Sequence, residues 1–159
     1  MLTVFGEQAG AYMSLFDIWK ADKASIQQMS IKQITAIAGD GKVGDNSLCQ
    51  EELRSYFKEA PSDSLASYAN YCLEQPFEGS GYVLQDVVNE MGRRLEYSVE
   101  NGRYRGIHNA IGYDGIWDDG DGFSIVVEVK TTDAYRMSLN TVAGYRKALI
   151  EEGRISEHS

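Results

Sequence analysis

Three charged residues near the end of the chain, Asp114, Glu128 and Lys130, have the types and the spacing for chemistry on a phosphate group. Glu128 and Lys130 stand two residues apart in the segment "FSIVVEVK", whose composition is typical of a buried strand. Because side chains alternate across a strand, both charges point to the same face. A carboxylate or an ammonium group is costly to bury without a partner, so this strand predicts a site that both share.

Asp114 is expected to join them across a β-hairpin. The segments 111–117 and 123–130 flank a turn that contains two Asp-Gly dipeptides, and such dipeptides favour tight turns between antiparallel strands. A turn centred on either dipeptide gives paired residue numbers that sum to about 239–243. Asp114 then lies opposite a residue between Ile125 and Val129, where it can sit beside Glu128.

Two neighbouring carboxylates repel each other unless a proton or a cation joins them. Mg²⁺, or Mn²⁺ in its place, binds carboxylate oxygens, and Mg²⁺ usually keeps several waters. A lysine beside such an ion orients or deprotonates an attacking water, or stabilises negative charge on a phosphate. The three residues therefore predict metal-assisted hydrolysis of a phosphodiester. The alternative interpretation is a cluster of surface salt bridges at the end of a sheet.

These residues, with the helix predicted before them, resemble the PD-(D/E)xK, or restriction-endonuclease-like, nuclease superfamily. The resemblance covers about residues 77–152 by element order and rests on Asp114 and the later "EVK". It implies an α+β or α/β core of helix, three strands, helix and a further strand. It implies that Asp114, Glu128 and the backbone carbonyl of Val129 bind the metal. Lys130 would be the catalytic lysine of a Mg²⁺-dependent DNA endonuclease, of the restriction or defence type.

Two positions depart from the superfamily pattern. Tyr113 stands before Asp114, where the motif has proline. Many members also place a glutamate on the first helix near the metal, and the spacing puts Gln85 at that position. A glutamine is a weaker ligand, and we expect Gln85 to orient a metal-bound water. Glu90 is the other helical candidate, although its spacing fits less well.

Basic and aromatic side chains are interleaved in the segment 93–109, which joins the predicted helix to the hairpin. Their functional interpretation is contact with DNA phosphates close to the metal. The residues expected to make these contacts are Arg103, Tyr104, Arg105 and His108. The alternative is a solvated loop whose charge is balanced by neighbouring glutamates.

The elements that position these residues follow from apolar spacing. Residues 81–95 predict an amphipathic helix, because their apolar side chains fall near one stripe. Strands are predicted at 96–101, 111–117 and 123–130, and a last helix at 137–153 that ends at Gly153. Together they define a nuclease-like domain over residues 76–159.

Residues 1–75 predict a separate helical module, which ends before Pro76. Helices are expected at 11–21, 30–39, 47–60 and 64–75, with Ser47 and Gln50 forming a capping box. The aromatic side chains of this module are expected in its core. The superfamily core has no counterpart to it, so we expect an accessory domain that binds a protein partner.

Composition narrows the function classes. The chain has 159 residues and a net charge of −9, which argues against broad electrostatic attraction to nucleic acid but allows a local basic site. Its two cysteines lack the spacing of a zinc site and indicate a reduced, cytoplasmic protein. The first ten residues lack the features of a signal peptide. No segment has the apolar length to span a bilayer, so no membrane partner is expected.

The last six residues, "RISEHS", are too short and too polar to supply the further strand that the resemblance implies. We therefore expect the nuclease core to be truncated at its C-terminus, as an N-terminal fragment of a longer protein. The third strand would then have an open edge, which promotes pairing with a second copy of the chain. The alternative function is a catalytically silent nucleic-acid-binding or assembly module that retains the fold.

Overall fold

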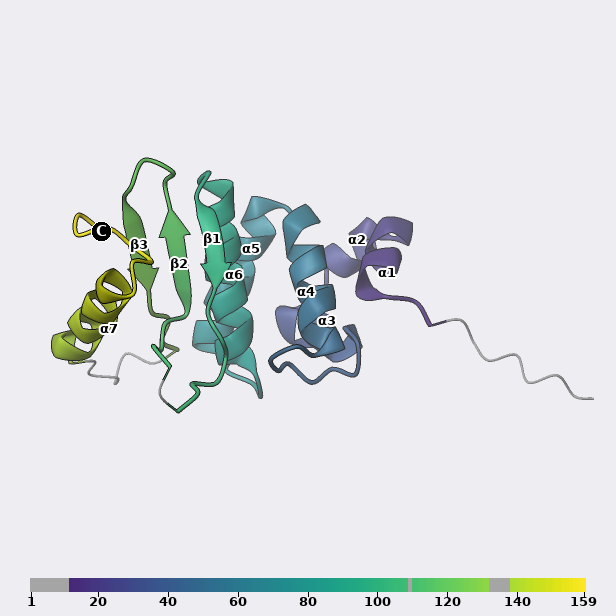
Figure 1. The fold of residues 1–159 in the computed structure, drawn as a ribbon. Coiled ribbons are helices and arrows are strands. Elements are labelled where there is room, and N and C mark those ends of the chain that lie inside the picture. The colour runs from purple at the N-terminus through teal and green to yellow at the C-terminus, as the bar shows by residue number, and fades with distance from the viewer. Residues whose placement is uncertain (1–11, 109, 132–137) are drawn as a thin grey trace, which may run out of the picture.

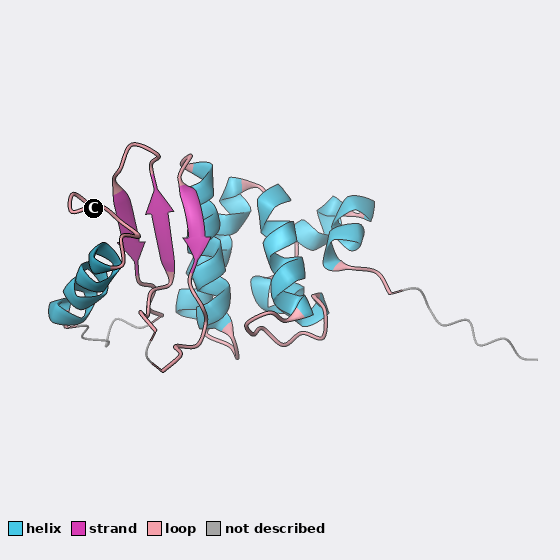
Figure 2. Cartoon of the chain, viewed as in Figure 1, coloured by secondary structure: helices cyan, strands magenta, loops and turns pink. Residues whose placement is uncertain are grey.

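The computed structural model describes residues 12–108, 110–131 and 138–159. Within these ranges the chain has an α+β fold of seven helices and one three-stranded antiparallel sheet (Figure 2). The helices are α1 (Leu15–Ala21), α2 (Lys23–Gln27), α3 (Ile31–Ile37), α4 (Leu48–Glu59), α5 (Ser62–Glu74), α6 (Ser80–Arg94) and α7 (Leu139–Glu151). The strands are β1 (Ser98–Asn101), β2 (Gly115–Asp118) and β3 (Ser124–Val127).

Three serine caps explain where helices of the N-terminal half begin. Ser14 and Ser30 each form a full capping box at the start of α1 and α3. Ser47 caps α4 as predicted, because its hydroxyl accepts from the Gln50 backbone N–H at 3.1 Å. The Gln50 side chain reaches the N–H of Asn46 instead of closing the predicted box on Ser47. The first ten residues, in which no signal peptide is expected, lie outside the described residues, as does the predicted start of the first helix at residue 11.

One hydrophobic cluster joins the helical module to α6. The cluster contains aromatic side chains of α4 and α5, as expected, with Tyr56 and Phe57 almost fully buried. Val83, Leu84 and Val87 of α6 belong to the same cluster. The boundary expected at residues 75–76 therefore does not separate two hydrophobic cores, and in Figure 1 α6 lies between the other N-terminal helices and the sheet.

The sheet has the order β1-β2-β3, and its hairpin has the predicted register. Gly115 pairs with Val127 and Trp117 pairs with Ile125, which lies inside the expected range. The turn depends on two glycines, since Gly120 and Gly122 have φ of +83° and +95°. The Asp119 side chain fixes the turn by accepting backbone N–H groups from residues 121 and 123.

The third strand is shorter than predicted, because β3 ends at Val127. Glu128 and Lys130 therefore follow the strand and do not lie within it. The reason is a competing hydrogen bond. The N–H of Val129 donates to the carboxylate of Asp114 at 2.6 Å, so a side chain takes the place of a backbone partner there.

Helices cover both faces of the sheet. Gly92 lets α6 approach β2 closely, since a Cβ at this position would lie 2.5 Å from the Trp117 ring. On the other face, a second hydrophobic cluster joins Ile116 of β2 to Leu149 of α7 and to Ile155 beyond it. Gly153 has φ of +68° and stops α7 close to the predicted end. The predicted start of this helix, residue 137, lies outside the described residues.

The polar C-terminal segment packs beside β3 (Figure 1). Ile155 is buried, and the hydroxyl of Ser159 accepts from the N–H of Ser124 at 3.0 Å. This contact covers the start of the β3 edge, which the sequence analysis expected to be open. None of the helices in the described ranges combines the length and the apolar character needed to cross a bilayer.

Candidate active site

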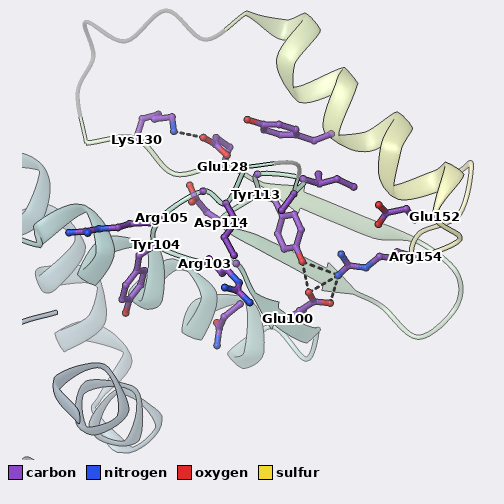
Figure 3. A pocket seen from close by; sticks show the side chains of 18 residues that line it. Glu100, Arg103, Tyr104, Arg105, Tyr113, Asp114, Glu128, Lys130, Glu152 and Arg154 are labelled. Carbon is purple, nitrogen blue, oxygen red and sulfur yellow. Dashed lines mark hydrogen bonds and ion pairs between the residues drawn. The ribbon is translucent and has the colours of Figure 1, made fainter. Parts of the chain in front are cut away.

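Asp114, Glu128 and Lys130 line one pocket of about 590 Å³ (Figure 3). Asp114 directly precedes β2 and Glu128 directly follows β3, so both lie at the same end of the hairpin. The segment 100–107 forms a second wall of the pocket, and Tyr145, Glu152 and Arg154 from α7 and the segment after it form a third. The structure thus brings together the three residues that the sequence analysis assigned to chemistry.

The backbone of Asp114 is held by four hydrogen bonds. Its N–H donates to Val127 at 2.9 Å, which continues the strand pairing by one residue. Its carbonyl oxygen accepts from the N–H of Gly102 at 2.9 Å. The same oxygen accepts from the side-chain amides of Asn89 at 2.8 Å and Gln85 at 3.1 Å. Three donors on one carbonyl fix the position from which the carboxylate projects.

Asn89 and Gln85 lie one turn apart on α6 and are both buried. Asn89 also accepts from the indole N–H of Trp117 at 3.0 Å, so it ties the helix to β2. Gly115 makes this approach possible, because a Cβ there would lie 2.1 Å from the Asn89 oxygen. Asn89 was missed in the sequence analysis. The sequence feature that could have identified Asn89 is its position as a second amide side chain, four residues after Gln85, on the buried face of the helix.

Gln85 does not lie where a residue that orients a metal-bound water is expected. Its amide nitrogen donates to the carbonyls of Asp114 and Gly102. It is not among the described residues that line the pocket. Glu90, the other helical candidate, pairs with Arg93 at 3.5 Å and lines a separate cavity of about 130 Å³. Both side chains therefore lie outside the described pocket lining and stabilise the structure around the site.

The electrostatics of Asp114 are those of two carboxylates brought together. Burial raises the pKa of Asp114, and the nearby negative charge of Glu128 raises it further. The N–H of Val129 and the charge of Lys130 act in the opposite direction, and the net pKa remains raised. A cation between the two carboxylates would remove this penalty.

Glu128 and Lys130 form an ion pair at the mouth of the pocket, drawn as a dashed line in Figure 3. The Glu128 side chain is 16% exposed and that of Lys130 is 36% exposed. The pair brings the two charged side chains into direct contact, which agrees with the expectation that they share one site. It also accounts for how two charged side chains are accommodated next to an apolar strand.

The ligands available here suit a hard cation. Within the described ranges, no group of three or more His, Cys, Asp or Glu side chains is placed to hold a metal. The site instead offers two carboxylates, and a backbone carbonyl such as that of Val129 is the expected third ligand. Mg²⁺ and Mn²⁺ bind through one or two carboxylates with waters completing the shell, so these residues fit either ion.

The predicted phosphate-binding loop divides into exposed and buried residues. Arg103 and Arg105 are exposed and line the pocket, as phosphate contacts require. Tyr104 is 9% exposed, and its ring stacks on Tyr82 with centroids 4.6 Å apart. It therefore anchors the loop and does not present a ring to solvent. His108 is exposed but is not among the described pocket-lining residues.

An ion pair behind Tyr104, buried at Asp86 and 28% exposed at Arg54, fixes this loop to the helices. Arg54 of α4 makes two hydrogen bonds to Asp86 of α6, at 2.9 and 2.8 Å. The hydroxyl of Tyr104 donates to the same carboxylate. Burial raises the pKa of Asp86, while Arg54 opposes the shift. Asp45 adds a second anchor by accepting the N–H of Tyr104 at 2.9 Å.

Arg154 contributes a further cation to the pocket. Its Nη2 donates to both oxygens of Glu100, at 2.6 and 2.7 Å, and to the hydroxyl of Tyr113 at 2.9 Å. Figure 3 shows this cluster on the side of the pocket opposite Lys130. This cluster was not predicted from the sequence, because the two charges lie 54 residues apart.

Comparison with protein-family models, with curated proteins and with solved structures found no match for this chain. The assignment of a function therefore depends on the site itself.

Proposed function

We propose that this chain is a metal-dependent nuclease of the restriction-endonuclease-like class, which hydrolyses phosphodiester bonds in DNA. One observation carries the proposal: the hairpin register places Asp114 beside Glu128 in a pocket that Lys130 also lines. The raised pKa of Asp114 agrees with it, because burial and, to a smaller extent, the nearby charge of Glu128 both disfavour the ionised carboxylate, which a bound cation would stabilise. The helix, three-strand and helix order of α6 to α7 agrees with the core of that superfamily.

The residues have separable roles in this reaction. Asp114 and Glu128 would hold the metal, whose contribution when bound would be Lewis-acid polarisation of the phosphate and a lowered pKa of bound water. Asn89 and Gln85 keep the Asp114 backbone in place, so the carboxylate does not need to reorganise during the reaction. Lys130 orients the attacking water or stabilises the charge that develops on the phosphate. Arg103 and Arg105 hold flanking phosphates of the strand.

The deciding experiment is a nicking assay on supercoiled plasmid, with Mg²⁺, with Mn²⁺ and with EDTA. We expect the parent protein to cut with either metal and to be inactive in EDTA. Asp114→Asn and Glu128→Gln should both be inactive. Asp118→Asn is the matched control, because Asp118 is a carboxylate of the same hairpin that is bonded to Ser124 at the other end. A parent protein without metal-dependent cleavage of plasmid, single-stranded DNA or RNA would refute the proposal.

A catalytically silent module that binds nucleic acid is the second candidate. The observation in its favour is the position of Gln85, which occupies a helix position where active superfamily members often have glutamate and which donates to backbone carbonyls behind the site. This candidate predicts binding of DNA with no cleavage under any metal. The same samples distinguish the two, if binding is measured by fluorescence anisotropy beside the nicking assay.

A further inference from the structure

We infer that Arg154 is a second phosphate-binding residue of the pocket, which holds a phosphate of the nucleic-acid strand next to the one cleaved. Glu100 is the counter-charge that tunes how strongly it binds. The inference rests on the proposed function, since it names a second contact for the same substrate.

The donors of Arg154 are only partly used within the described part of the chain. A guanidinium has five N–H donors in a planar fork that matches a phosphate. All its hydrogen bonds to described residues come from Nη2, and they go to Glu100 and Tyr113. The Nε and Nη1 donors make none with those residues. The Arg154 side chain is 34% exposed, and the residue lines the pocket.

The position of Arg154 suits a strand that passes the carboxylates. Arg154 follows α7, whereas Asp114 and Glu128 lie at the end of the hairpin, so the cation and the metal ligands lie on different walls of one pocket (Figure 3). A strand that places one phosphate at the carboxylates must direct a neighbouring phosphate along the pocket. The cluster of Arg154, Glu100 and Tyr113 is fixed in advance, which reduces the entropy lost on binding.

Glu100 and Arg154 act on an anion with opposite signs. The Glu100 carboxylate neutralises Arg154 in the free protein, and an incoming phosphate must share the guanidinium with it. Removing the Glu100 charge should therefore strengthen binding through Arg154. Glu152 provides a matched comparison, because it is a carboxylate of the same pocket with no hydrogen bond or ion pair to Arg154 among the described contacts.

The test measures affinity for a fluorescein-labelled, single-stranded 12-mer oligothymidylate in EDTA and again in Ca²⁺, across a range of salt concentrations. A single strand is used because it can bend into the pocket. Arg154→Gln should weaken binding about tenfold, the usual loss for one charge-assisted contact. It should lower the slope of log K against log salt by about 0.7. Lys147→Gln is the control for charge alone, because Lys147 lies on α7 and outside the described pocket lining.

A second pair of variants tests the role of Glu100. Glu100→Gln should tighten binding about threefold more than Glu152→Gln, and this difference should vanish when both are combined with Arg154→Gln. Circular dichroism confirms that each variant is folded. Equal effects of Arg154→Gln and Lys147→Gln would overturn the inference while leaving the proposed function intact. A parent protein that binds no oligonucleotide in either condition would also overturn the inference, whereas the nicking assay decides separately on the proposed function.

Discussion

Val129 and Asp114 are joined across the hairpin, because the backbone N–H of Val129 donates to Oδ2 of Asp114 at 2.6 Å. The bond fixes the carboxylate beside Glu128, which is the residue just before Val129. It also ends the regular pairing of β3, since the donor is satisfied by a side chain. The geometry of the candidate metal site and the length of the strand thus have one cause.

The first prediction concerns the stability of Asp114→Asn without metal. Burial and the Glu128 charge raise the pKa of Asp114 in the folded protein, so the folded state binds this proton more tightly than the unfolded state. The associated stability is present below the unfolded pKa, which is about 4, and is lost as pH rises through the folded pKa. Urea unfolding in EDTA should therefore show Asp114→Asn to be more stable than the parent at pH 7, with little difference at pH 3.

Asp118→Asn should show the opposite sign. The Ser124 hydroxyl and the Gly120 N–H lower the pKa of Asp118, so its carboxylate stabilises the folded state above the unfolded pKa. The variant should be less stable than the parent at pH 7, and the difference should shrink as pH falls. The same sign for both variants would contradict the electrostatic account of the hairpin.

The second prediction separates metal binding from chemistry. Lys130→Gln should still bind Mn²⁺, measured by calorimetry, because Lys130 is not a ligand, and the loss of its ion pair with Glu128 should change the affinity by no more than about 10–100-fold. The cleavage rate should fall by about 10²–10⁴, the usual contribution of a positioned acid–base group. Lys130→Arg keeps the charge and should recover part of the rate only if charge stabilisation dominates. Parental cleavage by Lys130→Gln would remove Lys130 from the site.

The third prediction concerns the loop that lines the pocket. Replacing Arg103 and Arg105 by alanine should weaken DNA binding and reduce its salt dependence, since each phosphate contact releases counterions. The control replaces Lys32 and Lys42, two exposed lysines of the helical half, by alanine. An identical salt slope in both double variants would indicate that the loop is only a solvated surface.

The fourth prediction concerns the buried anchor of that loop. Arg54→Met leaves Asp86, whose side chain is 1% exposed, without its main counter-charge. We expect a loss of about 3–5 kcal/mol in the free energy of unfolding. The loss should shrink at low pH, because protonation removes the unpaired charge. The double variant Arg54→Met, Asp86→Asn should be more stable than Arg54→Met alone, and urea unfolding of the three proteins measures this.

The hairpin was predictable from the sequence because its information is local. The Asp-Gly dipeptides indicate the position of the turn, and the alternation of side chains along each strand indicates which residues share a face of the sheet. Together they predicted that Asp114 lies near Glu128. Gly153 ended α7 for an equally local reason, its left-handed backbone.

The parts that were missed depend on pairs far apart in the chain. Asn89 bonds to Asp114 across 25 residues, and Arg54 bonds to Asp86 across 32. In neither pair does the sequence around one residue indicate which distant residue it contacts. Tyr104 was predicted to contact nucleic acid, and its burial was not foreseen because it depends on Asp86 and Tyr82, which lie far from it in the sequence. The boundary predicted at residue 76 falls between α5 and α6, but α6 shares its hydrophobic cluster with the helices before that boundary.

Because α6 shares a hydrophobic cluster with the helical half, we expect the molecule to unfold as a single cooperative unit. A fragment of residues 76–159 would expose Val83, Leu84 and Val87, each worth about 1.5–3 kcal/mol when buried. Their sum is comparable to the whole stability of an ordinary domain. The intact chain should therefore melt in one calorimetric transition, with equal van't Hoff and calorimetric enthalpies. We therefore expect a destabilising substitution in the helical half, far from the pocket, to lower the folded fraction as directly as one beside Asp114.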